Sequence, residues 1–278
     1  MNKKSAIITG ASSGFGLLSA INLAKSGFHV VATMRNLSKD QQLIEKAKED
    51  NVIDLIQVEE LDVSSPQSIA RFQTVLSEMR SIDVLVNNAG LAVGGFCEEL
   101  SLEEYRTQFE TNVFGVIALT QAVLPYMREQ RSGRIINMSS ISGRIGFPGL
   151  SPYTASKHAL EGFSESLRLE LKPFSIDVVL IEPGSYQTNI WASMDQVRIA
   201  EDSPYHFYME KLKSEIETGK QNHGDPEDVA RLVAQVARQT ITPDLRYPIG
   251  TGVKSNLLFK SLLPWKKLES IILKKLLR

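Results

Sequence analysis

The sequence predicts an α/β fold: one doubly wound parallel sheet with helices on both faces. Two observations lead to this prediction. Short β-branched runs alternate with longer helical stretches, and the runs are apolar throughout. Strands that are apolar on both faces are typical of parallel sheets covered on each side by helices. Because no repeat, low-complexity tract or linker divides the 278 residues, we expect a single domain over residues 1–278.

The expected elements follow one another in strand–helix order. The first strand is the apolar run at 6–10, and the first helix spans 16–27 and ends at a glycine. The further strands are expected at 29–34, 53–61, 83–88, 134–139 and 176–182. The further helices are expected at 38–50, 66–80, 101–111, 112–130 and 153–172. Ligands of such sheets bind at the carboxyl ends of the strands, so we expect the functional site there.

Two regions depart from this alternation. Residues 187–222 lack a clean period, are rich in aromatic residues, and follow a strand that should end at the site. We expect them to form a lid over an apolar ligand, with ordinary packing as the alternative. The tail at 256–278 contains the cationic amphipathic stretch PWKKLESIILKKLLR. We favour its packing on the protein itself or on a sister subunit over contact with a membrane surface.

Composition excludes several classes of function. The formal net charge of −1 gives no reason to expect a nucleic-acid partner. The single cysteine, Cys97, excludes an intrachain disulfide, and the four histidines lack metal-ligand spacing, so we expect no metal. The N-terminal segment does not resemble a signal peptide, and no run approaches the roughly 18 apolar residues of a membrane span. We expect a soluble, cytoplasmic protein.

The segment TGASSGFG at 9–16 follows the first strand and opens the first helix. Gly10 permits a tight turn, whereas Gly14 and Gly16 allow close approach of the backbone to a pyrophosphate and of the helix to the strand. The helix N-terminus presents free N–H groups to the anion. A strand–turn–helix in this position predicts a Rossmann-type dinucleotide site, with a purely structural turn as the alternative. The candidate contacts in the turn are Gly10, Ser12, Ser13, Gly14, Phe15 and Gly16.

The end of the second strand indicates which dinucleotide would bind. Enzymes that use NAD usually place an acidic residue there to accept a hydrogen bond from the ribose 2′-hydroxyl. This sequence has Arg35 instead, and no acid. A guanidinium suits a 2′-phosphate through charge-assisted, often bidentate hydrogen bonds. We therefore expect NADP(H) rather than NAD(H), with a merely solvated Arg35 as the alternative.

A tyrosine, a lysine and a serine indicate acid–base chemistry. Tyr153 and Lys157 stand four residues apart at the start of an expected helix, so both side chains face the same way. A phenol with its ordinary pKa near 10 is a poor base at neutral pH, and a neighbouring ammonium favours the phenolate. Ser140 closes a strand at its carboxyl end, where its hydroxyl can hold a substrate oxygen. This combination predicts proton transfer by Tyr153.

Seven short motifs occur along the chain. They are TGASSGFG (9–16), LDV (61–63), NNAG (87–90), TNVFG (111–115), NMSS (137–140), YTASK (153–157) and EPG (182–184). In this order and spacing they resemble the short-chain dehydrogenase/reductase family over about residues 4 to 250. The stretch at 159–171 looks like the branch of retinol and 17β-hydroxysteroid dehydrogenases, which tends toward apolar alcohols and ketones. Phe15 replaces a more usual isoleucine, at a site whose contacts are mainly made by the backbone.

The resemblance implies a role for each matched residue. Tyr153 would be the general acid in reduction and the base in oxidation, while Ser140 would orient the carbonyl oxygen. Lys157 would lower the pKa of Tyr153 and bind the nicotinamide ribose, and Asn112 would hold a water that links Lys157 to solvent. We interpret Ser139 as a packed strand residue. The remaining implied cofactor contacts are Asp62 and Val63 at the adenine, Asn88, Ala89 and Gly90 along the adenosine, and Pro183, Gly184 and Thr188 at the nicotinamide carboxamide or the phosphates.

These observations predict an NADP(H)-dependent oxidoreductase that interconverts a carbonyl compound and a primary or secondary alcohol, with a hydrophobic substrate as the family branch implies. A non-catalytic NADP(H)-binding sensor or scaffold is the alternative. This alternative is disfavoured because the sequence retains the four residues to which the resemblance gives catalytic roles, namely Asn112, Ser140, Tyr153 and Lys157. The resemblance also implies a homodimer or homotetramer.

Overall fold

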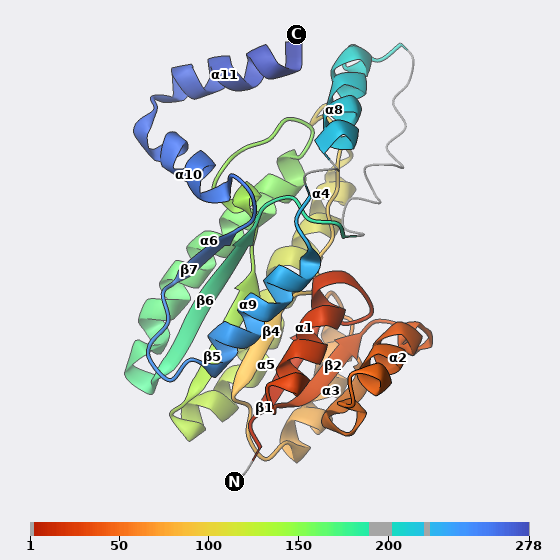
Figure 1. Cartoon of the computed structure of the whole chain (residues 1–278), viewed down its shortest axis with the longest axis vertical. Coiled ribbons are helices and arrows are strands. Elements are labelled where there is room, and N and C mark those ends of the chain that lie inside the picture. Colours follow the sequence, from red (N-terminus) through yellow and green to blue (C-terminus); the bar gives the residue numbers. More distant parts are fainter. Residues whose placement is uncertain (1–2, 189–201, 220–222, 278) are drawn as a thin grey trace.

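A parallel sheet of seven strands, in the order β3-β2-β1-β4-β5-β6-β7, forms the centre of the molecule (Figure 1). The computed structural model describes residues 3–188, 202–219 and 223–277. The strands are β1 (Ser5–Thr9), β2 (His29–Met34), β3 (Ile56–Glu60), β4 (Val84–Asn87), β5 (Gly133–Met138), β6 (Ile176–Pro183) and β7 (Arg246–Ile249). The strand order runs outward from β1 in both directions, so the predicted doubly wound α/β fold is confirmed.

Helices cover both faces of the sheet. On one face, buried side chains of α1 (Gly14–Lys25), α2 (Gln41–Glu49) and α9 (Pro226–Arg238) pack against β1, β2 and β6. On the other face, α3 (Pro66–Glu78), α5 (Gly115–Gln130) and α6 (Ser151–Leu171) pack against the same sheet. The central strands are therefore apolar on both sides, with β4 buried along its whole length.

The expected pair of helices at 101–111 and 112–130 is one continuous rod with an irregular centre. α4 (Leu102–Phe109) leads into a π-helical turn, Glu110–Phe114, and then into α5. A π turn inserts one extra residue into a helix and often occurs at a functional site. Here the turn buries Asn112 and Val113.

Among the elements that were not predicted from the sequence, α9 and β7 complete the layers of the fold. α9 begins at Pro226 behind the N-cap Asp225, whose side chain accepts a hydrogen bond from Glu227 N, and it packs on α1. β7 is short, and half-buried along its length, so it lacks the apolar run by which the other strands were identified. The predicted strand at 53–61 is also shorter than expected, because residues 53–55 form a 3-10 turn before β3.

The described helices of the two irregular regions lie beyond the carboxyl ends of the strands (Figure 1). The expected lid at 187–222 falls partly outside the described residues. Its described part contains α8 (His206–Gly219), on which α11 (Trp265–Leu277) packs. α10 (Val253–Leu262) follows β7 after a short turn. Among the described residues, none of the helices combines the length and apolar character that a membrane span requires.

Candidate active site

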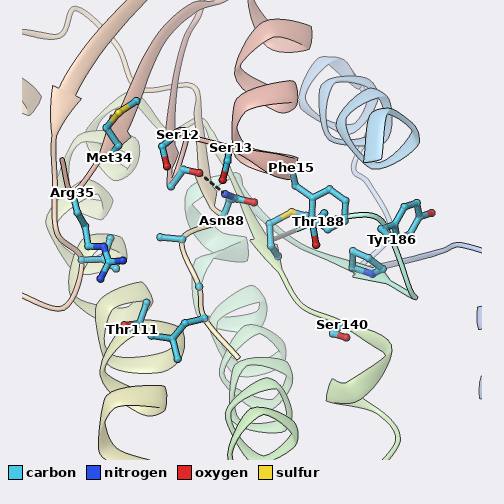
Figure 2. Close-up of a pocket in the computed structure, with 18 of the residues that line it drawn as sticks. Ser12, Ser13, Phe15, Met34, Arg35, Asn88, Thr111, Ser140, Tyr186 and Thr188 are labelled. Carbon is cyan, nitrogen blue, oxygen red and sulfur yellow. Dashed lines mark hydrogen bonds between the residues drawn. The ribbon is translucent and has the colours of Figure 1, made fainter. Parts of the chain in front are cut away.

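A cavity of about 550 Å³ opens at the carboxyl ends of the central strands, where the strand order reverses between β1 and β4. It brings together residues from most of the sequence motifs, and Figure 2 shows many of these side chains. The predicted residues that line it are Gly10, Ser12, Ser13, Gly14, Phe15, Arg35, Val63, Asn88, Ala89, Gly90, Ser140, Tyr153, Lys157, Pro183, Gly184 and Thr188. Gly16, Asp62 and Asn112 lie outside the lining.

The glycine turn is held in place by β4. Asn88 Nδ2 donates to the carbonyl oxygen of Thr9 at 2.8 Å and to that of Gly10 at 3.2 Å. In return, Thr9 Oγ1 accepts hydrogen bonds from the backbone N–H groups of Asn88 and Ala89. Gly10 has a φ of +69°, a conformation that favours glycine. A Cβ atom on Gly16 would lie 2.2 Å from the carbonyl oxygen of Gly10, so α1 starts directly against the turn.

The start of α1 suits an anion. The N-cap Ser13 makes no side-chain hydrogen bond to the first turn of the helix, and this turn holds no acidic residue. The free N–H groups of the first turn of α1 therefore face the cavity, together with the positive end of the helix dipole. The Ser13 side chain does not compete for these N–H groups as an acceptor. Together with the close-packed glycines, this arrangement fits the pyrophosphate of a dinucleotide.

Two cations line the end of the cavity that lies nearest the end of β2. Arg35 follows β2 and is exposed, as expected of a residue that reads a phosphate at the rim. Lys39 lines the cavity as well, in a 3-10 turn that Asn36 caps through a hydrogen bond from Ser38 N. Lys39 was not predicted as a site residue, because residues 38–50 were expected to form a polar helix. The pair Arg35 and Lys39 fits a 2′-phosphate.

Tyr153, Lys157 and Ser140 meet in the same cavity. Tyr153 and Lys157 occupy successive turns of α6, with Lys157 Nζ 5.6 Å from the centroid of the Tyr153 ring. Lys157 Nζ also donates to the carbonyl oxygen of Met138, at the end of β5, at 2.7 Å. Ser140 Oγ accepts from Ser142 N at 3.1 Å and is hydrogen-bonded to Tyr153. α6 is thus fixed to the end of β5 beside the candidate substrate position.

Burial dominates the electrostatics of this pair. It raises the pKa of Tyr153 to about 12, although the hydrogen bond with Ser140 acts in the opposite direction. Burial also lowers the pKa of Lys157 to about 8, against the opposing negative charge of Glu161. In the protein alone, therefore, the phenol keeps its proton at neutral pH. This is the form of Tyr153 needed by an acid that donates to a carbonyl oxygen. It differs from the phenolate that the spacing of Tyr153 and Lys157 predicted.

Asn112 and Asp62 lie behind the cavity wall. Asn112 is buried, its Nδ2 donates to the carbonyl oxygen of Leu91 at 2.9 Å, and its Oδ1 accepts from the N–H of Leu91 at 3.0 Å. Because Leu91 lines the cavity, Asn112 fixes part of its wall. Asp62 Oδ1 accepts from the backbone N–H and the hydroxyl of Ser64, which holds the turn that carries Val63. The water relay and the adenine contact implied for these two residues remain predictions.

The buried charges around Glu161 on α6 were not predicted. Glu161, one turn beyond Lys157, accepts hydrogen bonds from the hydroxyl of Ser139 and from Arg246 Nε, the latter at 2.9 Å. Arg246 Nε lies 3.3 Å from Glu182, which is fully buried and also pairs with Arg144. Ser139 is packed, as predicted, and it also lines the cavity.

Further residues of the cavity wall also come from outside the motifs. Tyr186 lines the cavity and contacts Phe15 edge to face, with the ring centroids 5.5 Å apart.

The described aromatic residues of the expected lid lie away from the cavity lining: Tyr205 stacks on Phe96, and Phe207 is exposed. Among the described residues, no group of three or more side chains is arranged to hold a metal ion.

Comparisons with known proteins agree with this geometry. A family model described as short chain dehydrogenase matches residues 4–198. The chain is 55% identical over 279 residues to the uncharacterized oxidoreductase YusZ of Bacillus subtilis, covering 99% of each chain. It is 36% identical to human retinol dehydrogenase 8, covering 91% of this chain and 85% of that protein. The solved structure of a single-residue variant of actinorhodin polyketide ketoreductase with NADPH superposes with a TM-score of 0.77 at 31% identity, covering 90% of this chain and 97% of the other.

Proposed function

The chain belongs to the short-chain dehydrogenase family, and on that premise we propose that it is an NADP(H)-dependent oxidoreductase that interconverts a carbonyl compound and an alcohol, with Tyr153 as the general acid–base. The observation that carries the proposal is the shared cavity. One wall is the glycine turn at the uncapped start of α1, and the other presents Tyr153, Ser140 and Lys157.

NADP(H) is proposed as the cofactor on two grounds. The pyrophosphate would lie against the N–H groups at the start of α1, and Arg35 and Lys39 offer two positive charges for a 2′-phosphate. In addition, the similar actinorhodin ketoreductase was solved with NADPH. Bound NADPH would supply the hydride that reduces the carbonyl carbon.

The side chains of the cavity account for the fate of the proton. In reduction, the hydroxyls of Ser140 and Tyr153 donate hydrogen bonds to the carbonyl oxygen and orient it. The phenol then transfers its proton to this oxygen as negative charge develops there. Lys157 stays near the phenolate that remains and stabilises it by its positive charge. In oxidation the same proton returns to the phenolate of Tyr153.

We propose a hydrophobic substrate. The support is the similarity to retinol dehydrogenase 8. The segment at 187–222 is rich in aromatic residues, of which the described Tyr205 and Phe207 do not line the cavity. We also propose that the chain acts in the cytoplasm as one domain in a homodimer or homotetramer, with this segment as the lid over the substrate.

The test is NADPH oxidation, followed at 340 nm, with a panel of hydrophobic aldehydes and ketones. Tyr153→Phe should lower kcat/KM by on the order of 10²–10⁴-fold, the usual contribution of a positioned acid, while NADPH affinity stays near the native value. Tyr105→Phe is the matched control, because that hydroxyl bonds to Ser151 away from the cavity lining. Near-native turnover by Tyr153→Phe would refute the proposed role. Tight NADPH binding without turnover of any substrate would favour a sensor instead.

A further inference from the structure

The C-terminal helices expose large apolar side chains. On α10, Leu258, Phe259 and Leu262 are 57%, 56% and 69% exposed, and their spacing of three and four residues places them on one helical face. Trp265, at the start of α11, is 59% exposed, and Ile271 on the same helix is 57% exposed. The tail was expected to pack on the protein itself or on a sister subunit. In the chain alone, α11 packs on α8, and Val253, just before the tail, is buried.

The same helices are strongly basic. From Asn256 to the C-terminus the chain has six Lys and Arg residues and a single Glu, although the whole chain carries a net charge of −1. Lys254, Lys266, Lys267 and Lys274 are exposed beside the apolar side chains. Exposed Leu, Phe and Trp side chains combined with lysines are typical of helices that lie in the interface of an anionic bilayer.

α10 starts at the wall of the candidate active site. Val253, the first residue of α10, packs on Gly184 of the cavity wall, where an added Cβ would lie 2.6 Å from Val253 Cγ2. Partial burial and the nearby positive charge of Arg144, four residues after Ser140, both lower the pKa of Lys260. Figure 1 shows α8, α10 and α11 together beyond the carboxyl ends of the strands.

We propose that α10 and α11 dock on an anionic lipid surface and hold the mouth of the cavity against it. The apolar side chains enter the boundary between headgroups and acyl chains, while the lysines pair with lipid phosphates. An apolar substrate dissolved in the membrane then reaches the cavity without crossing bulk water. Docking itself does not depend on the proposed reaction, so the two can be tested apart.

A second copy of the chain is a less suitable occupant. In a symmetric dimer built on this face, each tail meets the other tail, because a two-fold interface uses the same patch twice. Two groups of lysines would then face each other with one Glu in each tail to compensate. Anionic lipid offers the opposite charge across the whole face.

The experiment uses the full chain and two kinds of vesicle: equal parts phosphatidylglycerol and phosphatidylcholine, or phosphatidylcholine alone. The protein should sediment with the anionic vesicles at low salt, lose this association as salt rises, and remain in solution with the neutral ones. Removing two charges with Lys266→Gln and Lys267→Gln should weaken association about thirtyfold, since one basic residue near the surface contributes about fivefold. Phe259→Asp should abolish it.

Ile241→Asp is the matched control, because Ile241 is 74% exposed on the loop that precedes β7, at the other end of that strand from α10. It should bind anionic vesicles like the native chain. NADPH oxidation with a water-soluble aldehyde, measured without vesicles, should be native in Phe259→Asp, which separates failed docking from failed catalysis.

A fluorescence measurement gives an independent readout. The chain has two tryptophans, so Trp191→Phe leaves Trp265 as the sole reporter. Its emission should shift to the blue on anionic vesicles and be quenched by brominated lipids. The proposal is overturned if full-length protein never associates with anionic vesicles, or if Ile241→Asp loses binding equally. It is also overturned if Phe259→Asp converts a dimer to a monomer while the native chain ignores lipid, because the face then belongs to a second copy.

Discussion

Replacing Gly16 by alanine tests the contact between α1 and the glycine turn. The new Cβ would lie 2.2 Å from the carbonyl oxygen of Gly10, 2.8 Å from its carbonyl carbon and 2.5 Å from Nδ2 of Asn88. Two of these atoms belong to the backbone and the third holds the turn to β4, so no flexible side chain can give way. Either α1 or the turn has to move by about 1 Å, given a normal C···O contact of roughly 3.3 Å.

The expected cost follows from this overlap. Overpacking a rigid site costs about 1–3 kcal/mol, which corresponds to a fall in Tm of roughly 2–10 °C for a chain of this size. A larger effect is expected on NADPH binding, because the displaced atoms belong to the turn and helix start that would hold the pyrophosphate. We expect at least about a tenfold rise in Kd, equivalent to about 1.4 kcal/mol.

The assay is thermal unfolding followed by circular dichroism, with NADPH titration by fluorescence. Gly162→Ala on α6 is the matched control, since an added Cβ there has no neighbour within 4 Å. It should leave NADPH binding unchanged and add about 0.5–1 kcal/mol of stability, because glycine disfavours a helix interior. If Gly16→Ala melted and bound NADPH like the native chain, α1 would not start against the turn as described.

Two further changes probe the cofactor end and the buried charges. Arg35→Asp should raise the KM for NADPH by at least about tenfold and lower the KM for NADH. The reason is that a carboxylate repels a 2′-phosphate but accepts a hydrogen bond from a 2′-hydroxyl. An unchanged ratio of the two KM values would mean that Lys39, and not Arg35, binds the 2′-phosphate. Glu161→Gln removes the charge that raises the pKa of Lys157, so Lys157 should lose its proton at lower pH. The alkaline limb of the kcat/KM profile for reduction should then shift to lower pH, whereas a loss of activity with an unshifted limb would indicate a purely structural role for Glu161.

The sequence predicted the parts of the site whose residues lie close together along the chain. The glycine turn and the Tyr153–Lys157 pair each lie within one segment, where local geometry determines which side chains face the same way. The cluster of Glu161, Glu182 and Arg246 could not be found in this way. Its members belong to α6, β6 and β7, and they meet only through the sheet register that pairs Glu182 of β6 with the strand carrying Arg246.

The pKa of Tyr153 shows a second limit of sequence reasoning. The spacing to Lys157 suggested a phenol made more acidic by its neighbour. Tyr153 is only 4% exposed, however, and burial raises its pKa against the opposing hydrogen bond with Ser140 in the protein alone. Burial depends on the whole fold, so a count of neighbours along one helix does not reveal it.

The π-helical turn at Glu110–Phe114 has a consequence for how this site tolerates changes in chain length. Each helical residue adds about 100° of rotation, and the π turn accommodates one residue more than an α-helix of the same rise would. Deleting one residue there would make α4 and α5 one regular α-helix. The direction in which the side chains of one part point would then rotate relative to the other part by about 100°. Either Asn112 would swing away from Leu91, or all of α4 would rotate by about a quarter turn on α6. Length variation in this rod is therefore expected to accumulate at its ends, outside residues 110–114.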